Sequence, residues 1–206
     1  MRIGLDFDNT IIAYGDVFLA AAKERGLIAD NFQGGKQSVR DAIRLLPDGE
    51  LAWQRLQGHV YGQGISNASM YDGVEAFLRR CRAQGRSVAI VSHKTRYGHH
   101  DPSRVDLRAA ALDWMRSRGI IGAGEFSIPP EQIFFEDNRD DKLARIAALG
   151  CTHFIDDLEE VLLDPAFPAG VTRILFSDRE TNMAQPPCAV CPTWEHIERQ
   201  VFGRGG

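Results

Sequence analysis

The chain has 206 residues, of which 44% are hydrophobic and 25% are charged. This balance is ordinary for a globular protein and allows one buried core, or one core with a small insertion. The formal net charge is -4, which argues against nucleic acid or an anionic membrane surface as the partner. No apolar run approaches transmembrane length, and the chain begins with a strand-like segment rather than a signal peptide, so we expect a cytoplasmic protein.

The first predicted element is a strand over residues 2–6, which runs directly into Asp6-Phe7-Asp8-Asn9-Thr10. Side chains alternate along a strand, so Asp6 and Asp8 leave its end on the same side. Two close carboxylates repel each other, and such a pair is costly unless a cation holds it or chemistry uses it. The end of this strand is therefore a candidate site.

Residues 14–70 contain helical patterns but no convincing strand. The apolar faces predict roughly three helices, with Asp16 and Ser38 as N-terminal caps. We expect a small helical insertion that sits over the strand ends. Residues 1–13 and 71–206 would then form the core.

Beyond residue 70, strand-like and helical patterns alternate. Strands are predicted over 87–92, 132–135, 152–155 and 172–176. Helices are predicted from a capping-box-like start at Asp72 and Glu75, over 104–118 and 139–149, and after Thr193. This alternation indicates a doubly wound, Rossmann-like parallel sheet, in which ligands bind beyond the C-terminal ends of the strands.

The remaining polar groups of interest fall at that same edge of the predicted sheet. They are Ser92 after the strand 87–91, Lys142 near the start of the helix 139–149, and Asp156 and Asp157 after the strand 152–155. A hydroxyl, an ammonium group and four carboxylates therefore converge.

This order of groups resembles the four-motif pattern of the haloacid dehalogenase (HAD) superfamily: DxDxT, then Ser or Thr, then Lys, then an acidic pair. The resemblance covers nearly the whole chain, and the insertion resembles the small C1-type helical cap of that family. It implies a Mg2+-dependent phosphatase that hydrolyses a small phosphorylated metabolite through an aspartyl-phosphate intermediate.

The resemblance also implies residue roles. Asp6 is the nucleophile, and Asp8 protonates the leaving group and then activates water. Ser92 and Lys142 hold the phosphoryl oxygens. The expected Mg2+ ligands are Asp6, the main-chain carbonyl of Asp8, Asp156 and, directly or in support of another ligand, Asp157. Contacts to substrate are expected from Thr10, His93 and Lys94.

Several alternatives stay open. A phosphomutase or phosphotransferase shares the first half of the reaction, and a non-catalytic phosphate-responsive module has a similar topology. Lys94 competes with Lys142 as the main phosphate-binding lysine. On the insertion, Lys36, Arg40 and Arg44 either meet an anionic substrate or form a solvated helix face. The sequence predicts neither the substrate nor the oligomeric state.

The four cysteines are typical of cytosolic thiols rather than of a disulfide framework: Cys81, Cys151, Cys188 and Cys191. Cys188 and Cys191 have CxxC spacing. Without a second such pair they make at most half a zinc site, and the prolines around them favour a loop.

Overall fold

The computed structural model describes residues 1–178 and 188–203. Internal contacts divide the chain into two compact units. Unit 1 comprises Met1–Ile12, Met70–His93 and Gly119–Gly206, and unit 2 comprises Ala13–Ser69 and Lys94–Arg118. Unit 2 therefore contains a second segment, Lys94–Arg118, which the sequence analysis had assigned to the core.

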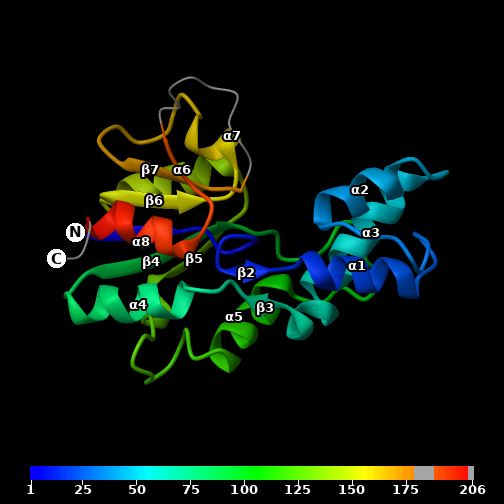
Figure 1. Cartoon of the computed structure of the whole chain (residues 1–206), viewed down its shortest axis with the longest axis horizontal. Coiled ribbons are helices and arrows are strands. Elements are labelled where there is room, and N and C mark those ends of the chain that lie inside the picture. The colour runs from blue at the N-terminus through cyan, green and yellow to red at the C-terminus, as the bar shows by residue number, and fades with distance from the viewer. Residues whose placement is uncertain (179–187, 204–206) are drawn as a thin grey trace. The chain divides into compact units, whose positions relative to one another are not determined.

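The main sheet of unit 1 has six parallel strands in the described residues, in the order β5-β4-β1-β6-β7-β8 (Figure 1). The strands are β1 (Arg2–Leu5), β4 (Ser87–His93), β5 (Ile133–Glu136), β6 (His153–Asp156), β7 (Thr172–Phe176) and β8 (Ala189–Cys191). The chain builds outward from β1 to one side and then to the other, so the strand order reverses at β1. Ligands of doubly wound sheets bind at this switch point. The predicted fold class is confirmed.

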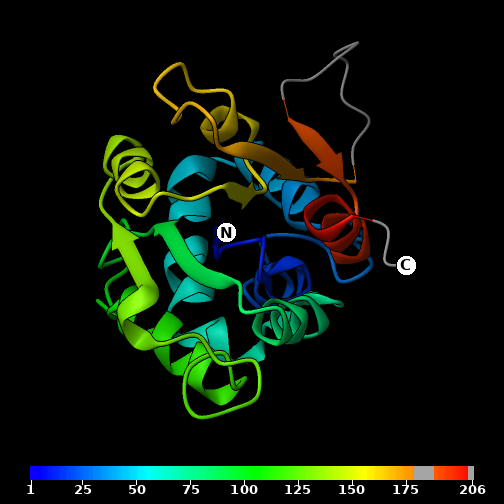
Figure 2. The same cartoon turned by 90° about the vertical axis from the view of Figure 1, so that its left-hand side faces the viewer.

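Helices cover both faces of this sheet. Figure 2 shows α4 (Val74–Ala83) and α8 (Trp194–Phe202) on one face, and α6 (Arg139–Ala148) and the short α7 (Glu159–Leu162) on the other. A 3-10 turn, η2 (Pro130–Gln132), precedes β5. No helix in the described residues is both long enough and apolar enough to cross a membrane.

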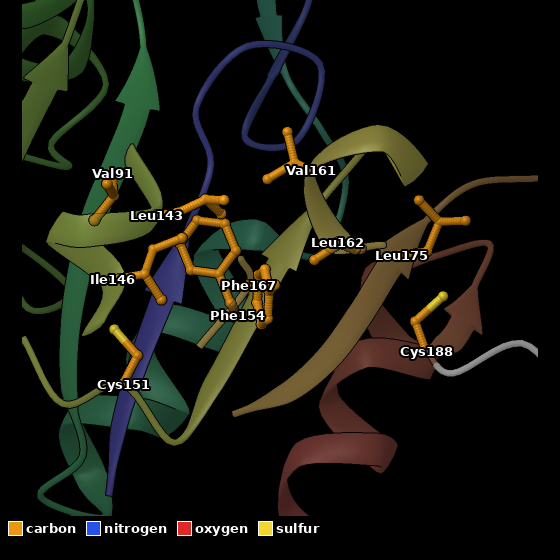
Figure 3. Close-up of a cluster of buried hydrophobic side chains, with 10 residues drawn as sticks. All are labelled: Val91, Leu143, Ile146, Cys151, Phe154, Val161, Leu162, Phe167, Leu175 and Cys188. Carbon is orange, nitrogen blue, oxygen red and sulfur yellow. The ribbon is translucent and has the colours of Figure 1, made fainter. Parts of the chain in front are cut away.

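A buried apolar cluster fixes α6 on the sheet (Figure 3). Leu143 and Ile146 come from α6, and Phe154 comes from β6. Burying side chains of this size stabilises the folded state by about 1.5–3 kcal/mol each. Because Lys142 precedes Leu143 on the same helix, this packing also sets where the Lys142 side chain begins.

Unit 2 is helical. It contains α1 (Gly15–Glu24), α2 (Lys36–Arg44), α3 (Gly49–Tyr61), the 3-10 turn η1 (Gln63–Asn67) and α5 (Leu107–Ser117). Its core includes Phe18 stacked on Trp53, with ring centroids 4.9 Å apart. Trp114 of α5 donates from Nε1 to the Ala68 carbonyl at 3.0 Å, which ties the second segment to the first. A separate two-stranded sheet pairs β2 (Ile12–Ala13) with β3 (Ser69–Met70).

Three predicted helix caps are wrong. Helix α1 begins after Tyr14, so Asp16 lies in its first turn. Helix α2 begins after Gly35, so Ser38 also lies inside its helix. Helix α4 begins after Gly73 rather than Asp72, because Gly73 has a φ of 90° and a Cβ there would lie 2.8 Å from Trp194 Cβ. Glycine can occupy this position without strain, and a capping box cannot form around it.

Several further elements were not predicted. The short strand β3 lies within residues 14–70, where no convincing strand was expected, because two residues are too few to show an alternating pattern. The loop expected around the CxxC sequence includes the strand β8, which pairs with β7. Helix α7 has four residues, too few to show a helical period in the sequence.

Candidate active site

The loop after β1 presents Asp6 and Asp8. The Asp6 main-chain N–H donates to the Ile155 carbonyl at 2.9 Å, which continues the parallel ladder one residue past the strand. Phe7 is fully buried. Its carbonyl accepts from the Ile11 and Ile12 N–H groups at 3.0 and 3.2 Å, so the chain turns tightly here. The Asp6 side chain therefore projects from a main chain that hydrogen bonds hold in place.

Asp6, Lys142 and Asp156 form a buried ion triad. Lys142 Nζ lies 2.7 Å from Asp6 Oδ1 and 2.6 Å from Asp156 Oδ2. The three residues are 5%, 1% and 0% exposed, respectively. Charges this deeply buried need partners, because water no longer solvates them. The structure thus brings together three residues that the sequence placed on different elements.

Burial and charge shift the pKa values of this triad. Burial raises the pKa of Asp6 to about 7; Lys142 opposes this shift, and Asp156 and Asp8 add to it. Burial alone would lower the pKa of Lys142, but the Asp6 and Asp156 carboxylates raise it well above its ordinary value. Lys142 therefore stays an ammonium group at neutral pH.

Three carboxylates are placed to hold one cation. Asp6, Asp156 and Asp157 each offer an oxygen, and these oxygens lie within 4.8 Å of one another. A hard divalent cation prefers oxygen donors spaced in this way. The Asp156 carboxylate is also oriented by its second oxygen, which accepts from the Leu158 N–H at 3.0 Å. The donor set fits Mg2+, and the expected Asp8 carbonyl ligand stays a prediction.

Two buried hydroxyls come from the segments that carry this site, one from a strand and one from a turn. Ser92 on β4 is 1% exposed and Thr10 is 0% exposed, and neither hydroxyl has a hydrogen-bond partner in the described structure. Buried polar atoms are normally paired, so such exceptions point to a missing ligand or solvent molecule. The Thr10 main-chain carbonyl, rather than its hydroxyl, secures the loop by accepting from Trp194 Nε1 at 3.1 Å.

His93 and Lys94 have contacts that differ from those within the ion triad. The exposed His93 ring bonds through Nε2 to the Asp137 carbonyl at 3.0 Å, which links the ends of β4 and β5. Lys94 is the first residue of its segment of unit 2, and its ammonium lies 4.9 Å from the centroid of the Tyr61 ring. Lys142 bonds the carboxylates of Asp6 and Asp156.

Two contributors were missed by sequence reasoning. Asn138 caps α6 by accepting from the Asp141 N–H at 2.8 Å, and so fixes where the Lys142 helix starts. Asn directly before a helical pattern is the signal that identifies it. Phe154 lies 5.5 Å from Lys142 Nζ by its ring centroid. A buried strand phenylalanine gives no such signal, because its ring could face any neighbour.

Comparison with known proteins identifies the fold. No family model and no curated protein matches the sequence. Solved structures do match. A haloacid dehalogenase-like family hydrolase from Xanthomonas campestris has a TM-score of 0.56 and 11% identity, covering 98% of this chain and 94% of that one. A predicted phosphoglycolate phosphatase from Haemophilus somnus has a TM-score of 0.56 and 16% identity, covering 97% of both chains.

A third match, the Protein Tyrosine Kinase A of Mycobacterium tuberculosis, has a TM-score of 0.64 and 16% identity, covering 98% of this chain and 97% of that one. At these identities the likeness concerns the fold. The HAD-type fold that the motifs implied is therefore confirmed.

Proposed function

We propose that this chain, which has the fold of haloacid dehalogenase-like hydrolases, is a Mg2+-dependent phosphatase acting on a small phosphorylated metabolite. The observation that carries the proposal is the buried Asp6 and Asp156 carboxylates bonded to the Lys142 ammonium, with the half-buried Asp157 carboxylate within reach of the same cation, at the point where the strand order reverses. Carboxylates and one lysine in this arrangement suit phosphoryl transfer, since they supply a nucleophile, cation ligands and a fixed positive charge.

Asp6 is the nucleophile in this proposal. Its carboxylate attacks phosphorus, the bond from phosphorus to the leaving oxygen breaks, and an aspartyl-phosphate forms. A bound Mg2+ supplies positive charge that offsets the repulsion between carboxylate and phosphate. Asp8, two residues further on, gives its proton to the leaving oxygen. It then takes a proton from the water that hydrolyses the intermediate, which restores both residues.

Lys142 and Ser92 hold the transferring group. Lys142 stays protonated and offers N–H donors from a nearly inaccessible position. The Ser92 hydroxyl, which has no partner in the described structure, gains one when it donates to a phosphoryl oxygen. Thr10 offers a second hydroxyl of this kind. Unit 2 serves as the C1-type cap that selects the substrate, and the protein works in the cytoplasm without nucleic acid or membrane.

Phosphoryl transfer to an alcohol is the nearest alternative, because it shares the first half-reaction. The likeness to the kinase named among the similar structures is a likeness of fold. A dehalogenase is also among the similar structures. The acid at Asp8 argues against dehalogenation and against a non-catalytic role.

The test is phosphate release from a panel of phosphorylated metabolites and one aryl phosphate. Each is assayed with chelator, with Mg2+ and with Ca2+. We expect turnover with Mg2+, little with Ca2+, whose looser geometry misplaces nucleophile and phosphate, and none with chelator. Asp6→Asn protein from the same preparation controls for a contaminating phosphatase. Full activity in excess chelator, or equal activity in Asp6→Asn, contradicts the proposal. Adding an alcohol and looking for a new phosphate ester separates transfer from hydrolysis.

A further inference from the structure

A tryptophan of α8 bonds the turn that carries Asp8. Trp194 Nε1 donates to the Thr10 main-chain carbonyl at 3.1 Å, although 184 positions separate the two residues in the chain. Trp194 is 1% exposed and Thr10 is 0% exposed, and both belong to unit 1. Water does not reach a carbonyl buried in this way, so removing the indole N–H would leave the acceptor without this donor and without a solvent replacement.

The Trp194 indole is held by its own surroundings. Trp194 begins α8, and the Thr193 hydroxyl caps this helix by accepting from the His196 N–H at 3.4 Å. The indole meets Phe77 of α4 edge to face, with ring centroids 5.1 Å apart, and lies 6.0 Å from the ring centroid of Phe176 on β7. A large ring packed among other rings has little freedom to move. The Nε1 donor is therefore fixed by contacts from two helices and the sheet.

The turn that receives this bond is closed by main-chain hydrogen bonds on both sides of Asp8. The Phe7 carbonyl accepts from the Ile12 N–H at 3.2 Å, and the Ile12 carbonyl accepts from the Asn9 N–H at 3.0 Å. Asn9 has a φ of 59°, in the left-handed region that asparagine enters more easily than most residues. Since Thr10 lies within this closed turn, the bond to its carbonyl anchors the main chain that carries Asp8.

We propose that Trp194 is a positioning residue for general acid catalysis: its bond to the Thr10 carbonyl holds the turn from which the Asp8 carboxyl gives its proton to the leaving oxygen. This inference rests on the proposed phosphatase function. Proton transfer needs both groups within hydrogen-bond reach, and a displacement of about 1 Å can cost roughly 100-fold in rate. Asp6 depends less on this bond, because its N–H is held separately by the Ile155 carbonyl at 2.9 Å. Loosening the turn should therefore impair the acid more than the nucleophile.

Single-turnover formation of the phosphoenzyme tests the proposal in Trp194→Phe, which keeps an aromatic ring and removes the N–H. Trp114→Phe is the matched control, because Trp114 is 3% exposed and its Nε1 donates to the Ala68 carbonyl at 3.0 Å in unit 2. Rates are measured with propyl phosphate and with 4-nitrophenyl phosphate, whose leaving group needs less protonation. We expect Trp194→Phe to lower the ratio of the propyl rate to the aryl rate roughly 10-fold, and Trp114→Phe to leave this ratio unchanged. An unchanged ratio in folded Trp194→Phe overturns the proposal.

A double substitution shows whether the effect passes through Asp8. In Asp8→Asn protein no acid is left to displace, so adding Trp194→Phe should leave the rate ratio where Asp8→Asn alone puts it. A further fall in the ratio overturns the proposal, because Trp194 then acts by another route. An equal loss of rate for the two esters in Trp194→Phe also overturns it, since that is the result of lost stability or of a displaced nucleophile.

Hydrogen exchange separates this inference from the phosphatase proposal, because it requires no activity. In metal-free wild type, the Trp194 indole proton and the Ile12 amide proton should show equal protection, since both bonds break when the turn opens. This comparison tests the proposal even if Trp194→Phe does not fold; an indole proton that exchanges freely while Ile12 stays protected overturns it. Folded Trp194→Phe should speed exchange at Ile12, and Trp114→Phe should not.

The two proposals then fail separately. If these exchange effects appear in a protein without phosphatase activity, the proposed function fails alone. If the protein is an active phosphatase in which Trp194→Phe changes neither the exchange at Ile12 nor the rate ratio, the proposal for Trp194 fails alone.

Discussion

Lys142 donates to Asp6 Oδ1 at 2.7 Å, although 136 positions separate the two residues in the chain. The same ammonium donates to Asp156 Oδ2, so a single lysine joins the ends of β1 and β6 to α6. The geometry of the candidate site therefore depends on the packing of that helix. This relationship makes Lys142 a structural residue as well as a proposed catalytic one.

Lys142→Met should lower the free energy of unfolding of the metal-free protein by about 3–5 kcal/mol, because it leaves two buried carboxylates without their cation. Urea unfolding measures this loss. Added Mg2+ should restore part of the stability by binding those carboxylates in the folded state. Phosphate release should be lost even at saturating Mg2+. Lys23→Met, which removes a lysine from unit 2, should change stability by less than about 0.5 kcal/mol. A similar loss in both variants would refute the ion triad as the cause.

Asp6→Asn should abolish turnover while the protein stays folded. An amide of similar shape cannot attack phosphorus. Phosphate release and circular dichroism are measured together on the same sample. Asp140→Asn, an exposed carboxylate in the first turn of α6, is the control and should keep wild-type turnover. Retained activity in a folded Asp6→Asn protein means that another residue is the nucleophile.

Asp8→Asn should impair catalysis differently, because it keeps the nucleophile and the main-chain carbonyl. Loss of general acid catalysis costs typically ~10²–10⁴-fold. Aryl phosphates have good leaving groups and need less protonation than alkyl phosphates. Single-turnover formation of the phosphoenzyme should therefore fall more for an alkyl than for an aryl ester. Equal losses with the two esters would exclude Asp8 as the acid.

The cysteines should be unreactive at neutral pH. Burial raises the pKa of Cys81 to about 12 and those of Cys151 and Cys191 to about 11, and it also raises the pKa of Cys188. A raised pKa in the folded state means that stability is intact below the unfolded thiol pKa of about 8.5 and is lost as pH rises toward 11. Alkylation of the thiols at pH 8 should be slow in native protein and fast in urea. The urea concentration at the midpoint of unfolding should decrease as the pH is raised from 8.5 to 10.5. One thiol that alkylates rapidly in native protein contradicts this picture.

The sheet was predictable from sequence because its central strands are short apolar runs that end at polar or charged residues. Ser92 and Asp156 lie near the C-terminal ends of such strands, and parallel strands bring these ends to one edge. Lys142 lies near the start of the helix α6. The packing that joins them was not predictable: the contact of Lys142 with Phe154 depends on the rotation of α6, which no periodicity specifies. The three caps failed for a local reason, since Gly35, Tyr14 and Gly73 begin their helices without side-chain caps.

The residues that make up unit 2 could not be predicted from the sequence either. Residues 104–118 have the same apolar period as a helix that covers a sheet, but α5 groups with unit 2 instead. Amphipathicity shows that a helix has a buried face and does not show which partner buries it. Removing residues 14–69 alone would therefore strip α5 of contacts such as that between Trp114 and Ala68. An informative deletion of unit 2 has to take out both of its segments.

The two segments of unit 2 have a consequence for the order of events on the ribosome. The chain passes between the units four times, and Lys94–Arg118 is made only after β4. The helices of residues 13–69 thus emerge before the segment that completes their core, and the Ala68 carbonyl meets Trp114 only when 46 further residues have been synthesised. Until then, these helices expose the apolar face that α5 later covers. We expect nascent chains arrested before residue 107 to be cleaved readily by protease within residues 13–69, and chains extended past residue 118 to be protected there.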